Sequence, residues 1–127
     1  MKTLKTKFFS LILISLVLLI NGCTETVDFD GSEIANQNQF ILDFDALNVI
    51  KKHEMSLFAG DIVDVKIVKE SGRLDVEVKS SDNQVIYQGN DVSSCEFSLT
   101  INDLDIYWFS VNGRKASGYV SFIVRDK

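Results

Sequence analysis

The sequence predicts an all-β fold, a single antiparallel β-sandwich of seven to eight strands that follows an N-terminal signal helix. Apolar and polar residues alternate with a period of two through most of the chain after residue 39, as in strands that bury one face. Turn-forming residues interrupt this alternation about every eight to twelve residues, a spacing typical of sandwiches and barrels. Only residues 46–53 have a pattern compatible with a helix, one or two turns long.

Eight segments are predicted to be strands, because their apolar residues alternate or form short runs bounded by turns. They are residues 40–44, 55–58, 63–67, 74–78, 85–87, 95–101, 106–111 and 117–124. Glycine, asparagine, aspartate and serine between these segments predict turns at residues 71–72, 81–83, 89–91, 102–103 and 112–113. The chain contains no proline, so no proline-rich ligand motif is expected.

The alternation also predicts which side chains of the last two segments face the core. The predicted core set is Tyr107, Phe109, Val111, Val120, Phe122 and Val124. The outward set, a possible binding patch if both strands share a sheet, is Ile106, Trp108, Tyr119 and Ile123. Exposed apolar patches mark contacts with partners, sugars or membranes. The alternative, that a loop or the segment 40–44 covers these side chains, stays open.

The first 23 residues have the order of a secretion signal. Three lysines precede an apolar stretch, residues 8–20, which ends at Asn21, Gly22 and Cys23. The stretch is shorter than the roughly 20 residues of a membrane-spanning helix. It resembles a bacterial lipoprotein signal peptide, and the alternative is an ordinary secretion signal. The resemblance implies that residues 1–22 are removed and that Cys23 carries acyl chains such as palmitate. These chains would anchor the protein to the cell membrane on its extracytoplasmic side.

Residues 23–38 are predicted to be the lipidated N-terminus and a flexible acidic tether, and residues 39–127 the sandwich domain. A tether of this length would span about 20 Å. The chain has 13 basic and 18 acidic side chains, and three of the basic ones lie within residues 1–22. The mature chain is therefore strongly acidic, which excludes nucleic acid as a partner and favours a monomer.

Cys95 is the second of only two cysteines, so it has no partner if Cys23 is acylated. The alternation of Cys95, Phe97, Leu99 and Ile101 predicts that it points inward. A buried free cysteine behaves as a small hydrophobic residue. The alternative is a reactive exposed thiol.

Four segments show a further resemblance. They are LFAGDIVDVKI at 57–67, GRLDVEV at 72–78, IYWFSVNG at 106–113 and ASGYVSF at 116–122. These segments resemble small bacterial lipoproteins whose domain is a GOLD-like or jelly-roll β-sandwich, and together they span most of residues 53–125. The resemblance implies a fold and a location in the cell envelope, and it transfers no catalytic residue.

The residues that could carry chemistry are few. His53 is the only histidine, so a histidine-rich zinc site is excluded and a solvent-exposed role is favoured. Asp103 and Asp105 flank a turn, where two carboxylates could hold calcium or act with His53 in a hydrolase. Neither the calcium-loop pattern nor a nucleophile turn is present. No cofactor and no metal are therefore predicted.

These observations favour a membrane-anchored, non-enzymatic binding module, with an unidentified protein or envelope glycan as its partner. A small envelope hydrolase, or an inhibitor of an envelope enzyme, is the alternative. A calcium-stabilised structural domain is a further alternative.

Overall fold

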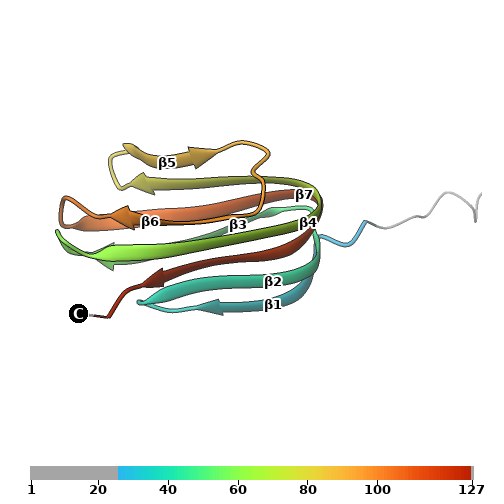
Figure 1. Ribbon diagram of the computed structural model, residues 1–127, viewed down its shortest axis with the longest axis horizontal. Coiled ribbons are helices and arrows are strands. Elements are labelled where there is room, and N and C mark those ends of the chain that lie inside the picture. The colour runs from blue at the N-terminus through green and yellow to red at the C-terminus, as the bar shows by residue number, and fades with distance from the viewer. Residues whose placement is uncertain (1–25, 127) are drawn as a thin grey trace, which may run out of the picture.

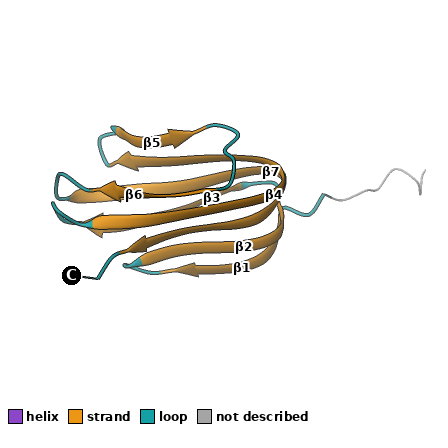
Figure 2. Cartoon of the chain, viewed as in Figure 1, coloured by secondary structure: helices purple, strands orange, loops and turns teal. Residues whose placement is uncertain are grey.

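The computed structural model describes residues 26–126, which form seven strands and no helix (Figures 1 and 2). The strands are β1 (Phe29–Ala35), β2 (Gln39–Leu47), β3 (Ile50–Leu57), β4 (Ile62–Ser80), β5 (Val85–Gly89), β6 (Cys95–Thr100) and β7 (Asp105–Val124). The helix predicted at 46–53 is wrong, because these residues end β2, turn and enter β3. The predicted signal peptide and Cys23 lie outside the described residues. Within residues 26–126 no helix has the length and hydrophobicity of a membrane span.

The strands form two layers joined by β4 and β7, each of which runs through both (Figure 1). In the first layer the order is β1, β2, the second half of β7, the first half of β4 and β6. In the second layer the order is β3, the first half of β7, the second half of β4 and β5. Every pairing is antiparallel, so one hydrogen-bonded sheet folds over onto itself. The predicted antiparallel β-sandwich is confirmed.

The two long strands bend where the sequence predicted chain reversals, so the turns at 71–72 and 112–113 are wrong. The pairing of β4 with β7 shifts register on both sides of Ser71, which is the pattern of a β-bulge. Gly72 has φ +77°, and a Cβ there would collide with the carbonyl oxygen of Lys115. Lys115 itself has φ +48°. Bulges bend a strand without ending its pairing, and so β4 and β7 continue into the second layer.

β1 belongs to the sandwich rather than to the predicted tether. It pairs with β2 from Phe29 to Ala35. Ahead of it, the Asn48 side-chain amide donates to the carbonyl oxygen of Val27 at 2.8 Å. The prediction of a flexible tether is therefore wrong from Val27 onward. Most of β1 is solvent-exposed, so it lacks the alternation by which strands are predicted.

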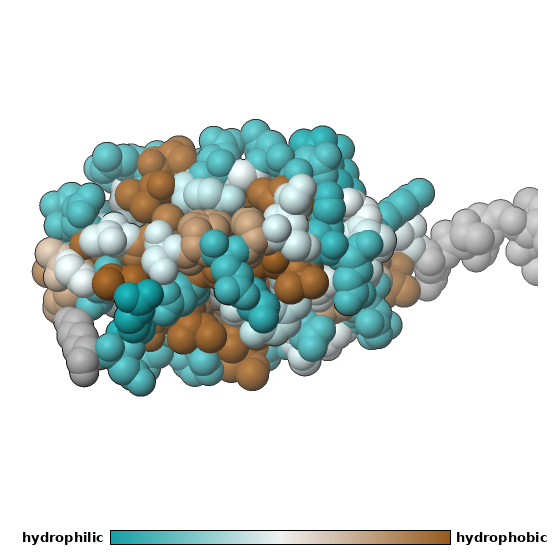
Figure 3. Space-filling model, viewed as in Figure 1, coloured by the Kyte–Doolittle hydropathy of each residue, from teal (hydrophilic) through white to brown (hydrophobic). Residues whose placement is uncertain are grey.

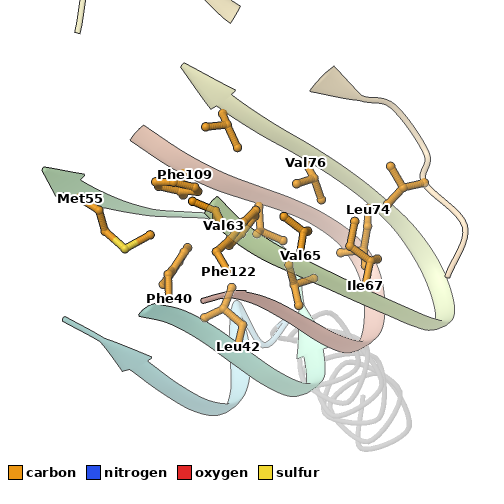
Figure 4. Packing of buried hydrophobic residues seen from close by; sticks show 14 of the residues in the cluster. Phe40, Leu42, Met55, Val63, Val65, Ile67, Leu74, Val76, Phe109 and Phe122 are labelled. Carbon is orange, nitrogen blue, oxygen red and sulfur yellow. The ribbon is translucent and has the colours of Figure 1, made fainter. Parts of the chain in front are cut away.

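The core lies between the layers and consists of the inward side chains of both (Figure 4). The rings of Phe109 and Phe122, which come from the two halves of β7, lie 5.0 Å apart. A second contact between the layers joins β5 and β6, where the ring of Tyr87 lies 4.6 Å from that of Phe97. The predicted core face is confirmed, since five of its six side chains are buried and Val124 is partly buried.

The prediction that Cys95 is buried is wrong, because its side chain is exposed. Cys95 is the first residue of β6, which pairs with β4 alone among the described strands. Tyr87 from the facing layer covers Phe97, two residues further along. The alternation gives the correct side of the strand, but the facing layer does not extend over its first residue.

Candidate binding site

The four residues predicted to form one outer patch lie on two different faces. Ile106 and Trp108, each 43% exposed, belong to the half of β7 that pairs with β3. Tyr119 and Ile123 belong to the half that pairs with β2. Because the bend carries β7 from one layer into the other, the outward side chains of its halves point to opposite sides of the sandwich. The single patch is therefore not formed.

The face that carries Tyr119 and Ile123 has an apolar strip that the sequence analysis did not recognise. Ile34 of β1 pairs with Ile41 of β2, which pairs with Ser121 between Tyr119 and Ile123. Ion pairs interrupt the strip at Lys66 and Glu96 and at Asp64 and Arg125. Figure 3 likewise shows hydrophobic residues in separate groups among polar ones on the face that it displays. This face contains no tryptophan.

Trp108 lies in a depression on the outer face of the second layer. The depression has a volume of about 280 Å³ and is lined by Lys52, Glu77, Lys79, Asn83, Trp108 and Ser110. Trp108 and Ser110 form its floor on β7. Lys52 of β3 lies opposite Ser110 on one side, and Glu77 of β4 lies opposite it on the other. Three adjacent strands therefore supply the floor and both walls.

A second depression continues the first along β7. It has a volume of about 210 Å³ and shares Lys52, Glu77 and Ser110 with the first. The side chains it adds include Asp75, Gln88, Asn90 and Asn112. We call the two depressions together the Trp108 trough. From Trp108 to Asn112 its floor is about 14 Å long at 3.4 Å per residue.

The trough is lined by two lysines, Lys52 and Lys79, and two carboxylates, Glu77 and Asp75, but they do not pair one to one. Lys79 Nζ lies 3.1 Å from Glu77 Oε1, and Arg73 Nε lies 3.3 Å from Asp75 Oδ1. Both carboxylates of the trough therefore have a cation beside them. Lys52 forms no ion pair within the described part of the chain. Among the charged groups that line the trough, the Lys52 ammonium is therefore the one that lacks a counter-ion from residues 26–126.

The turn between β4 and β5 fixes Asn83 at one end of the trough. The backbone N–H of Asn83 donates to the Ser80 carbonyl at 3.0 Å, and the Gln84 N–H donates to Ser80 Oγ at 3.1 Å. The Ser80 hydroxyl in turn donates to the Asp82 carboxylate, which lowers the pKa of Asp82. Asn83 has φ +65°, a conformation that asparagine tolerates better than most residues. The trough is therefore bounded by a hydrogen-bonded turn.

The hydrolase hypothesis required His53 to lie near Asp103 or Asp105, and the structure separates them. On β3, His53 is paired with Phe109, whereas Leu57 is paired with Asp105. Four residues of strand correspond to about 14 Å. His53 is half-buried: its Nε2 lies 2.6 Å from the Asn36 carbonyl oxygen, and its ring lies 5.4 Å from that of Phe40. His53 is therefore partly exposed to solvent, and the pairing with the aspartates is not formed.

Asp103 and Asp105 lie at the opposite end of the molecule from the bend, beside a cavity of about 290 Å³. The Tyr107 hydroxyl donates to the Asp103 carbonyl at 2.6 Å, and Ser81 Oγ donates to Asp105 Oδ1 at 2.5 Å. Burial raises the pKa of Tyr107, and the charges of Asp105 and Asp103 raise it further. Among residues 26–126, no group of three or more potential ligands is arranged to hold a metal ion.

Lys52, Glu77, Asn83 and Ser110 were not among the predicted site residues. Glu77 and Ser110 lie at outward positions of predicted strands, whereas Lys52 and Asn83 lie outside the predicted strands, and the strand order could not be predicted. Only the pairing of β7 between β3 and β4 brings these side chains to Trp108.

No known protein family matches the chain, and no curated protein matches it in sequence. Solved structures resemble it at low identity. They include PliG of Aeromonas hydrophila, a periplasmic inhibitor of g-type lysozyme, at 12% identity and a TM-score of 0.47, with 81% of this chain and 93% of that chain covered. A CBM4 structure gives 11% identity, a TM-score of 0.40 and 76% coverage of both chains. An RmlC-like cupin of Desulfovibrio desulfuricans has 13% identity and a TM-score of 0.36, with 81% of this chain and 92% of that chain covered. None of these similarities assigns a function.

Proposed function

We propose that this protein is a lipid-anchored lipoprotein of the cell envelope, and that its sandwich is a non-enzymatic binding module on the extracytoplasmic side. The support for the anchor is the basic, apolar and small-residue order that ends at Cys23. Two or more acyl chains on one cysteine give stable membrane attachment. The support for the binding role is the Trp108 trough.

The position of the anchor determines how the trough is presented. Val27 is tied to Asn48, which accepts a hydrogen bond from the backbone N–H of Lys115 at 2.6 Å. The chain therefore enters the sandwich at the bent end (Figure 1). At most about 14 Å of extended chain joins Cys23 to Val27. The bent end would then face the membrane, and Trp108, seven residues before Lys115 on β7, would lie up to about 24 Å further out.

The single observation that carries the binding role is the exposure of Trp108. Tryptophan is highly buried on average, because its large apolar surface is costly to hydrate. Here it is 43% exposed on a central strand, flanked by polar side chains rather than covered by a loop. Tryptophan is enriched where binding energy concentrates. The trough is therefore built as a contact surface.

Because Trp108 is the only tryptophan of this chain, its fluorescence reports this site once the emission of each added fraction on its own has been subtracted. The lipidated protein is reconstituted in vesicles and titrated with fractions of envelope polysaccharide and solubilised envelope protein. We expect one fraction to shift the emission to shorter wavelength and to protect Trp108 from iodide quenching. Binding is then measured independently of Trp108 fluorescence, from the amount of that fraction that sediments with the vesicles.

The variant Trp108→Ala is expected to lose at least tenfold in binding, whereas Ile123→Ala, on the opposite face, is expected to bind as the wild type does. Unchanged binding by Trp108→Ala, or no response to any fraction, would remove the proposal. A response to the protein fraction alone would favour the inhibitor hypothesis over a glycan partner.

A further inference from the structure

We infer that the Trp108 trough binds an acidic oligosaccharide, with one sugar ring stacked on Trp108 and a carboxylate of the ligand paired with Lys52. The inference rests on the proposed function, because it names the ligand of the same site. Three observations support it: the backbone of the trough floor is fully paired, the side chains of the trough are mostly polar, and Lys52 has no counter-ion among the described residues.

The backbone of the trough floor is already paired on both sides. The first half of β7 pairs with β3 through residues 105–112 and with β4 through residues 107–114. A peptide strand binds to a sheet through unpaired backbone groups at an edge. The trough floor lies at the centre of its layer and has no such edge. Its ligand must therefore be recognised by side chains.

The side chains of the trough are mostly polar, with Trp108 as a large aromatic surface at one end and Ile50 and Val76 as the apolar residues of the other. Asn83, Gln88, Asn90, Ser110 and Asn112 each offer hydrogen-bond donors and acceptors along it. The cores of protein interfaces, by contrast, are rich in aromatic and apolar side chains and poor in charge. A sugar has hydroxyl groups around its rim and a C–H face that packs against an aromatic ring. An oligosaccharide therefore fits this sequence of groups better than a protein surface does.

The charge on Lys52 selects an acidic sugar. Glu77 and Asp75 have Lys79 and Arg73 as partners, whereas Lys52 has no partner among the described residues. The protein as a whole is acidic, with a formal charge of −5, so it does not attract polyanions non-specifically. A carboxylate on the ligand would supply the missing counter-ion of Lys52. Charge-assisted hydrogen bonds of this kind are stronger than neutral ones.

The test begins with an array of neutral and uronate-containing oligosaccharides, followed by calorimetry with the best ligand and with its methyl ester. The ester keeps the sugar and removes the negative charge. We expect the acid to bind at least tenfold more tightly than the ester. Lys52→Ala should bind the acid at least tenfold more weakly than the wild type, whereas the affinity of Lys52→Arg should stay within about threefold of the wild type. Lys52→Ala should bind acid and ester equally, since the two changes remove one contact.

Four results would overturn the inference. Equal binding of acid and ester by the wild type would show that no carboxylate pairs with Lys52. Binding of neutral sugars alone would leave a glycan site of a different class. No binding to any sugar, while an envelope fraction still shifts the Trp108 emission, would refute the inference and leave the proposed function standing. If neither the array nor the envelope fractions give a response, both fail.

Discussion

Asn48 connects the N-terminal end of the described chain to the bend of β7. Its Oδ1 accepts a hydrogen bond from the backbone N–H of Lys115 at 2.6 Å, while its Nδ2 donates to Val27. Lys115 has φ +48°, an unusual conformation for lysine, so its N–H is aimed away from the strand ladder. One side chain thus stabilises the bulge that joins the two layers and fixes the point at which the predicted anchor enters.

Replacing Asn48 should weaken both connections. We expect Asn48→Ala to lower the free energy of unfolding by about 1–3 kcal/mol, because the variant loses both hydrogen bonds. Asn48→Asp keeps the acceptor for Lys115 and should recover part of this loss. Urea denaturation measures both. Asn102→Ala, in the exposed loop before β7, is the control that should change little. A loss no larger than that of the control would contradict the role given to Asn48.

Gly72 should be essential to the bend of β4. An alanine there would adopt φ +77° and would also crowd the backbone of Lys115. We expect Gly72→Ala to destabilise the protein by about 2 kcal/mol or more. Gly60→Ala is a matched control, because Gly60 has φ +91° but a Cβ added there would have nothing within 4 Å of it. Only the conformational cost applies there, so equal losses in the two variants would show that crowding at the bend is unimportant.

The contrast between alternation and topology explains what could be predicted. Alternation describes one strand and its two faces, so it correctly assigned Phe109 and Phe122 to the core and Trp108 to the surface. The continuity of β4 depends on a long-range contact, that of Gly72 with Lys115, which a local turn signal such as Ser71-Gly72 cannot reveal. The sequence therefore predicted the sandwich and not the path of the chain between its layers.

The candidate site shows the same limit. Trp108 was recognisable as an outward aromatic residue, but its neighbours depend on which strands flank β7. Lys52 precedes it by 56 positions and joins the trough through the pairing with Ser110. β1 was missed for a different reason, since it is an edge strand with mostly exposed side chains and no apolar alternation.

The ion pair between Asp64 and Arg125 should make stability depend on pH. Arg125 Nη2 lies 2.6 Å from Asp64 Oδ1, and this hydrogen bond, together with that from Ser98, lowers the pKa of Asp64 below its ordinary 3.8. A carboxyl with a lower pKa in the folded state adds stability above pH 3.8, and this stability is lost as the pH falls through the folded-state pKa.

We expect Arg125→Ala to lose less stability than the wild type between pH 6 and pH 3. Urea midpoints at a series of pH values give the comparison. In the variant, the pKa of Asp64 measured by NMR should move back toward 3.8. Parallel pH profiles for the two proteins, with an unchanged Asp64 titration, would show that the pair does not form in solution.

The Cys95 thiol should react in the native protein, because its side chain is exposed at the start of β6. We expect a disulfide reagent such as DTNB to modify it at a rate close to that in urea, and Cys95→Ser to abolish the reaction. In the lipidated protein this should be the only reactive thiol, since Cys23 would be acylated. Modification that requires unfolding would show that Cys95 is buried, as the alternation alone had predicted.

Trp108 and Phe109 are adjacent in the chain, and their replacement should have opposite consequences. Phe109 is fully buried and packs 5.0 Å from Phe122, so Phe109→Ala should cost about 3–5 kcal/mol of stability through lost burial and a cavity. Trp108 is 43% exposed, and Trp108→Ala should cost about 1 kcal/mol or less while it removes binding. Thermal and urea denaturation measure both variants. A loss for Trp108→Ala comparable to that for Phe109→Ala would mean that the indole packs as a structural element, and the trough would then have no aromatic surface to offer a ligand.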